Sequence, residues 1–97
     1  SDEIKIGLKV NSQIISIEGM GNGPIDAMID ALKNHLSMDI KISDYHQHAI
    51  SSGSDAKAVA YSELLLNGQS VWGVGIHQNT VIAGLQSVIG GLNRLSI

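Results

Sequence analysis

Apolar and polar residues alternate at the start of the chain. Ile4, Ile6, Leu8 and Val10 are separated by Lys5, Gly7 and Lys9. A period of two is typical of a strand with one buried face, so the pattern predicts a strand over residues 4–10. Residues 13–18 alternate in the same way and predict a second strand, with Ile15 and Ile17 on one side. The Asn11-Ser12 pair between these segments suits a two-residue hairpin turn.

Three glycines at every second position, Gly19, Gly21 and Gly23, precede Pro24 and a segment with helical periodicity. The apolar residues of that segment are Ile25, Met28, Ile29, Leu32 and Leu36. Proline suits the first position of a helix, where its missing N–H costs nothing. The pattern therefore predicts a strand that ends at Glu18, a glycine loop, and a helix from Pro24 to Leu36. Free N–H groups at such a helix start can bind a carboxylate or a phosphate, and a tight turn without a ligand is the alternative.

The second half of the chain carries the same kinds of signal in the same order. They predict a strand over residues 38–47, a loop over 51–54, a strand over 56–66, a hairpin turn at Asn67-Gly68, a strand over 69–76 and a helix from about Thr80. Asn-Gly between two apolar segments is the strongest of these turn signals.

The two halves repeat one another at an offset of 56 residues, the separation between Asn11 and Asn67. Without any gap, this offset also aligns Leu8 with Leu64, Gln13 with Gln69, Gly19 with Gly75, and Ala27 with Ala83. We therefore predict one α+β domain over residues 1–97, made of two βββα units at 4–36 and 38–97, with helices packed on antiparallel strands. The first unit lacks its opening strand and the chain starts with Ser1, so we expect a piece of a longer protein.

The second predicted helix has a face of small residues, namely Ala83, Gly84, Ser87 and Gly91. Each glycine inside a helix costs about 1 kcal/mol, which favours close packing of another backbone as the reason for this face. The alternative is that Gly90-Gly91 frays the end of the helix. This face and the aliphatic strands also lead us to expect a homodimer.

Composition narrows the classes of partner. Six basic residues against nine acidic ones give a formal net charge of −3, without a basic patch, which argues against nucleic acid and anionic membrane. The chain has no cysteine and therefore neither disulfide nor thiolate chemistry. Its few aromatic residues are Trp72, Tyr45 and Tyr61, so the core is expected to be aliphatic.

Three groups of residues suggest chemistry, and each has a simpler interpretation. His46 and His48 would share one face of a strand and could bind zinc, but no third ligand follows at a motif spacing. Gly19-x-Gly21-x-x-Pro24 half-resembles a dinucleotide fingerprint, but it follows a hairpin and has proline at the third glycine position. Ser51, Ser52 and Ser54 near His48 lack an orienting third group for nucleophilic catalysis. These residues do not make an enzyme by themselves.

Several separated motifs together resemble one known family. They are Gly19-x-Gly21-Asn22-Gly23-Pro24-Ile25-Asp26-Ala27, Asp44-Tyr45-x-x-His48-Ala49, Gly53-x-Asp55-Ala56-x-Ala58, and Val71-Trp72-Gly73-Val74-Gly75-Ile76 with Asn93-Arg94. This pattern resembles the C-terminal leucine-binding regulatory and dimerisation domain of 2-isopropylmalate synthase. The resemblance implies a cytoplasmic homodimer that binds L-leucine and inhibits a distant catalytic barrel, which condenses acetyl-CoA with 3-methyl-2-oxobutanoate. The divalent metal is expected in that absent barrel, and no cofactor is expected in this domain.

The resemblance also implies which residues contact leucine. They lie at the glycine segment, along the third strand, after the serine loop and in the last strand: Asn22, Gly23, Ile25, Ile42, Tyr45, Ala49, Ala56, Ala58 and Ile76. The glycine segment would hold the polar end of the amino acid, and a small aliphatic pocket would take its isobutyl group.

Other functions remain open at this point. The matching domain of citramalate synthase, whose effector is isoleucine, is the nearest alternative. A dimerisation module without a ligand and a stand-alone amino-acid-binding protein are two more. An upstream barrel in the full-length gene would exclude the stand-alone protein, and titration with leucine, isoleucine and valine would separate the others.

Overall fold

The computed structural model describes residues 2–10, 13–37, 39–50, 53–54 and 56–94. Two compact units divide the chain, one over Ser1–Met38 and the other over Asp39–Ile97, and each is described by itself. The expected turn at Asn11-Ser12 and the serines Ser51 and Ser52 lie outside the described residues. None of the described helices is both long and apolar enough to span a membrane.

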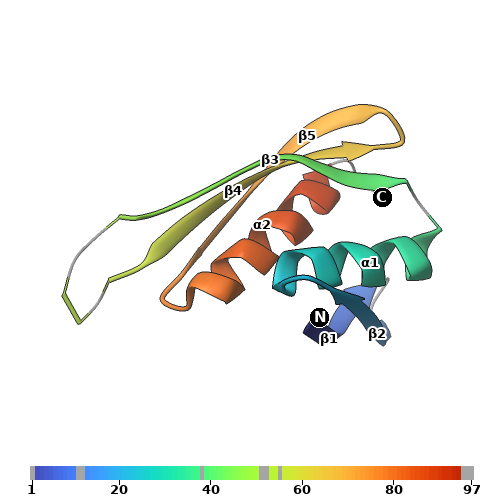
Figure 1. Ribbon diagram of the computed structural model, residues 1–97, viewed down its shortest axis with the longest axis horizontal. Coiled ribbons are helices and arrows are strands. Elements are labelled where there is room, and N and C mark those ends of the chain that lie inside the picture. The colour runs from blue at the N-terminus through green and yellow to red at the C-terminus, as the bar shows by residue number, and fades with distance from the viewer. Residues whose placement is uncertain (1, 11–12, 38, 51–52, 55, 95–97) are drawn as a thin grey trace. The chain divides into compact units, whose positions relative to one another are not determined.

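The first unit is a β-hairpin covered on one face by a helix (Figure 1). Strand β1 (Asp2–Val10) pairs antiparallel with β2 (Gln13–Gly21), and Ile6 lies opposite Ile17. Helix α1 (Pro24–Leu36) starts with proline, as its sequence predicts. It buries Ala27, Met28, Ala31 and Leu32, while Ile17 is the buried strand residue on this unit's core. The core is aliphatic, as composition predicts.

The predicted end of the second strand at Glu18 is wrong, because β2 continues to Gly21. Gly19 and Gly21 belong to the strand, and only Asn22 and Gly23 connect it to α1. A Cβ atom on Gly19 would lie 2.2 Å from the backbone oxygen of Ala27, and one on Gly21 would lie 2.7 Å from the Ala27 nitrogen. These glycines are therefore required because the helix backbone packs directly on the strand, rather than because the chain turns there.

The second unit is a three-stranded antiparallel sheet with a helix on one face (Figure 1). Its elements are β3 (Ile40–Ala49), β4 (Ala58–Leu66), β5 (Gln69–His77) and α2 (Thr80–Arg94), and the strand order is β3-β4-β5. Asn67 and Gly68 form the predicted hairpin turn, with positive φ angles of 50° and 87°. The first strand runs two residues past its predicted end at Gln47, and the next begins at Ala58 instead of Ala56.

The two units superimpose in sequence as predicted. Shifting β1, β2 and the start of α1 by 56 residues gives the printed bounds of β4 and β5 and the start of α2. The pairing registers agree as well, since Asp2 lies opposite Gly21 and Ala58 opposite His77. The fold class is confirmed: an α+β chain of two repeated units, in which β3 of the second has no counterpart among the described residues of the first.

The small-residue face of α2 packs against its own sheet. A Cβ atom on Gly73 would lie 1.9 Å from the backbone oxygen of Ser87 and 2.3 Å from the nitrogen of Gly91. Close backbone packing is therefore confirmed as the role of this face. Fraying at Gly90-Gly91 is wrong, because the helix continues to Arg94. Since the face is buried within the unit, it cannot supply the dimer surface for which it was invoked.

Candidate functional site

The expected ligand-binding residues fall into one group in each unit. Asn22, Gly23 and Ile25 lie where β2 joins α1 in the first unit. The second unit holds the remaining residues: Ile42, Tyr45, Ala49, Ala56, Ala58 and Ile76.

The start of α1 is an uncapped helix terminus. Gly23 is the N-cap residue, has an extended φ of 171° and provides no side-chain hydrogen bond, while its carbonyl accepts from the Ala27 N–H at 2.9 Å. Helix α2 differs at the equivalent position, where Asn79 Oδ1 accepts from the N–H groups of Val81 and Ile82 at 2.9 and 3.1 Å. The side chain of Asn79 thus does for α2 what no residue does for α1.

A hollow of about 310 Å³ lies beside this terminus. Its lining residues are Met20, Gly21, Asn22, Asp26, Ile29, Asp30 and Lys33. Asp30 Oδ2 accepts a hydrogen bond from the Met20 N–H at 2.9 Å. The hollow brings two carboxylates and one ammonium group to the helix start, so a ligand there would meet both signs of charge.

Four of the expected residues share the face of the second sheet that packs against α2. Ile42 lies opposite Leu64, Tyr45 opposite Ser62 and Ala49 opposite Ala58, and residues that pair across a ladder point to the same face. Their partners on β4 are buried.

Tyr45 packs against a small cluster of buried alanines. The cluster consists of Ala58, Ala60 and Ala83, of which the last belongs to α2. Burial desolvates the Tyr45 phenol and raises its pKa above the ordinary value of 10.0. The phenol therefore stays neutral through the physiological range, as a ring packed on apolar side chains should.

A second hollow, of about 240 Å³, lies where β3 ends and β4 begins. It is lined by Gln47, His48, Ala49, Ala56, Lys57, Ala58, Gln78 and Thr80. Three expected residues, Ala49, Ala56 and Ala58, thus meet at one place. Sequence reasoning missed the glutamines and Thr80, although Gln47 alternates with the two histidines and so had to face the other way. Gln47 Nε2 donates to the Thr80 carbonyl at 2.6 Å, which ties β3 to the start of α2.

Ile76 does not join this group. It pairs with Val59, on the sheet face away from α2, and is 50% exposed. Trp72 and Val74 of the same strand lie on that face and are also exposed. Together they form an apolar row on β5.

The other candidate chemistries find little support in the described residues. His46 and His48 do share a face, but His46 Nε2 lies 3.0 Å from Asp44 Oδ2, and the His48 ring lies 5.7 Å from that of Tyr61. In the described part of the chain no three His, Asp or Glu side chains are placed to hold a metal ion. The space beside Gly19 is filled by α1, so a dinucleotide pyrophosphate could not approach it.

The duplicated fold and the two hollows define a small α+β binding domain. The family model described as the LeuA allosteric (dimerisation) domain matches residues 1–96, and the chain belongs to this family. It is 42% identical to 2-isopropylmalate synthase of Schizosaccharomyces pombe over 97% of its own length and 16% of that protein. It is 40% identical to the enzymes of the same name from Mycobacterium leprae and Parafrankia sp., over 97% and 98% of the chain. The chain thus spans about one sixth of the length of these relatives.

Proposed function

We propose that this chain is the allosteric domain of a 2-isopropylmalate synthase, that it binds L-leucine, and that binding inhibits the enzyme in leucine biosynthesis. The observation that carries the proposal is the family match over residues 1–96, together with relatives of that name that align along almost the whole chain. The catalytic reaction, the condensation of acetyl-CoA with 3-methyl-2-oxobutanoate in the cytoplasm, and its divalent metal belong to a barrel outside this chain.

The hollow of the second unit supports an aliphatic amino acid as the ligand. Its alanines, Ala49, Ala56 and Ala58, leave space that larger aliphatic residues would fill, and Gln78 and Thr80 bring polar groups to its rim. Burial of an isobutyl group in such a site contributes about 1.5–3 kcal/mol. An apolar floor with a few polar groups is the usual composition of a small-molecule site.

The helix start of the first unit supports a zwitterionic ligand. The dipole of α1 and Lys33 would attract a carboxylate, while Asp26 and Asp30 would attract an ammonium group. A free amino acid carries both groups. This charge pattern suits it better than it suits a phosphate, which the two carboxylates would repel.

Calorimetric titration of the chain with leucine, isoleucine and valine tests the proposal. We expect saturable binding of leucine at one site and weaker binding of the other two. Tighter binding of isoleucine would favour the regulatory domain of citramalate synthase instead. No binding of any of the three would leave a dimerisation module and contradict the proposal.

A further inference from the structure

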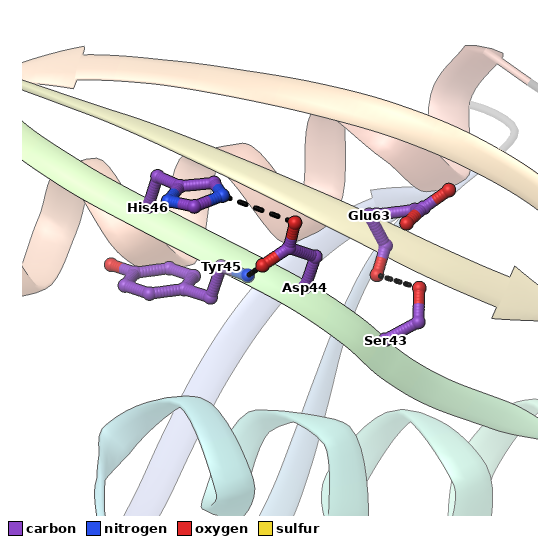
Figure 2. A network of polar contacts seen from close by, with 5 residues as sticks. All are labelled: Ser43, Asp44, Tyr45, His46 and Glu63. Carbon is purple, nitrogen blue, oxygen red and sulfur yellow. Dashed lines mark hydrogen bonds and ion pairs between the residues drawn. The ribbon is translucent and has the colours of Figure 1, made fainter.

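Strand β3 contains a bulge immediately before Tyr45. Ile42 lies opposite Leu64 and Asp44 opposite Glu63, so Ser43 is an extra residue in β3. Two residues of one strand therefore oppose one residue of its partner, which is the defining property of a β-bulge. Ser43 Oγ donates to the Glu63 carbonyl at 3.3 Å and fastens the extra residue to β4 (Figure 2).

This extra residue decides which side chains of β3 face α2. In a regular strand, residues at even spacing from Ile42 would share its face, which would bring Asp44, His46 and His48 to the α2 side. The structure instead places Tyr45 on that side, and Gln47 contacts Thr80 of α2 from there. Exposure follows the same change of period, because Ile40, Ile42 and Tyr45 are the least exposed residues of the strand.

The side chain of Asp44 lies at the centre of the bulge. Its Oδ1 atom accepts a hydrogen bond from the Tyr45 N–H at 2.9 Å, and its Oδ2 atom lies 3.0 Å from His46 Nε2 (Figure 2). The carboxylate of Glu63, directly across the ladder, accepts from Ser70 Oγ at 2.6 Å. Both carboxylates thus have other partners, which offsets the cost of placing like charges opposite one another.

We propose that Asp44 is a positioning residue for the ligand site: its carboxylate holds the bulge at Ser43 and so directs Tyr45 and Ala49 toward α2. The part that concerns leucine rests on the proposed function. The part that concerns the direction of Tyr45 depends only on the geometry of the second unit. Asp44 itself does not line either hollow described above.

The test compares Asp44→Ala, Asp44→Asn and His46→Ala with the parent chain in two measurements. Nuclear Overhauser contacts between the Tyr45 ring and the Ala83 methyl group report the direction of Tyr45, and calorimetry reports leucine affinity. Asparagine keeps an Oδ1 atom that can accept the same N–H, whereas alanine does not. His46→Ala removes the second partner of Asp44 and leaves its bond to Tyr45 intact.

We expect Asp44→Ala to lose the contacts between Tyr45 and Ala83 and to bind leucine about tenfold more weakly, a change equal to about 1.4 kcal/mol. Asp44→Asn and His46→Ala should keep the contacts and stay within about twofold of the parent. If Asp44→Ala does not fold, Asp44→Glu replaces it, because its carboxylate lies one methylene farther from the Tyr45 N–H and should also lose the contacts.

Two results would overturn the inference. One is a folded Asp44→Ala variant, or the glutamate variant in its place, that keeps the contacts between Tyr45 and Ala83. The other is an asparagine variant that loses them. A parent chain that binds no leucine would instead contradict the proposed function, and the contact measurement would still decide the role of Asp44.

Discussion

Ala58 shows how one small side chain can serve both packing and binding. It is 5% exposed, belongs to the alanine cluster of the second unit, and also lines the smaller hollow. Ala60 belongs to the same cluster but is fully buried and does not line the hollow. The two alanines therefore make a matched pair for separating ligand space from core packing.

Ala58→Leu is expected to abolish the response to leucine while the domain stays folded. The larger side chain fills the hollow, which removes the gain from burying the isobutyl group and adds an overpacking cost of about 1–3 kcal/mol. Together these effects weaken binding on the order of a hundredfold, as measured by calorimetry. Ala60→Leu should instead lower the melting temperature. A folded Ala58→Leu variant with parental affinity would contradict the assignment.

Tyr45 is expected to titrate above the ordinary pKa of a phenol. Because burial raises its folded-state pKa above 10.0, the folded state holds the proton more tightly than the unfolded chain. The stability from this difference is fully present below pH 10 and is lost as the pH rises through the folded-state pKa. Stability curves of the parent and Tyr45→Phe should therefore diverge only at alkaline pH, with the parent falling more steeply. Parallel curves would show that the phenol is not desolvated.

At the scale of elements, glycines determine how closely each helix approaches its sheet. Gly19 and Gly75 occupy equivalent positions of the repeat, and a Cβ atom at either would lie within 2.2 Å of a helix backbone oxygen. Gly23, four residues after Gly19, has nothing within 4 Å of its Cβ position. The same residue type thus serves close packing at one position and leaves open space at another.

Gly19→Ala is expected to destabilise the chain by about 3 kcal/mol or more, because a rigid helix backbone must move away from β2. Gly23→Ala is the matched control. Its extended φ suits any residue, so stability should change by less than about 1 kcal/mol. Chemical denaturation measures both changes. Equal stability of the two variants would mean that α1 does not pack on β2 as described.

A buried pair of hydroxyls joins β4 to α2. Ser62 Oγ and Ser87 Oγ lie 2.5 Å apart, both side chains are fully buried, and Ser87 Oγ donates onward to the Gly84 carbonyl at 2.6 Å. The equivalent positions of the first unit are Ile6 and Ala31, both apolar. The repeat therefore tolerates either a hydrogen-bonded pair or an apolar pair at this place.

Removing one hydroxyl should cost more than the pair is worth. Ser87→Ala leaves the Ser62 hydroxyl buried without Ser87 as its partner, for a loss of about 1–3 kcal/mol. Ser62→Ala removes one hydrogen bond and should cost about 0.5–1.5 kcal/mol. The double variant is expected to be less destabilised than the sum of the two, which a double-mutant cycle in denaturant measures. Strict additivity would show that the hydroxyls do not interact.

At the scale of the whole molecule, the family description names dimerisation, and we propose a homodimer. The surface cannot be the small-residue face of α2, which is buried within its own unit. Sedimentation should show two copies per particle, and the melting temperature should rise with protein concentration, since association favours the folded state by mass action. A monomer at every concentration, with a constant melting temperature, would contradict this prediction.

The residues expected to bind leucine came from a resemblance, and the structure supplies their arrangement. It brings Ala49, Ala56 and Ala58 to one hollow and turns Tyr45 toward α2. Ile76 lies on the other face of the sheet. These relations could not be predicted from the sequence because an extra residue in β3 changes the facing of every later side chain in that strand.

By itself, the sequence determined the elements and their repetition. Periods of two and of 3.6 residues are local properties, and an uninterrupted offset of 56 residues records that one unit is copied in the other. Only the tertiary structure decided that Gly19 lies inside a strand, that α2 continues through Gly91, and that Ser43 is an extra residue. Each of these depends on atoms of another element that come within contact distance, and no pattern within a single segment contains that information.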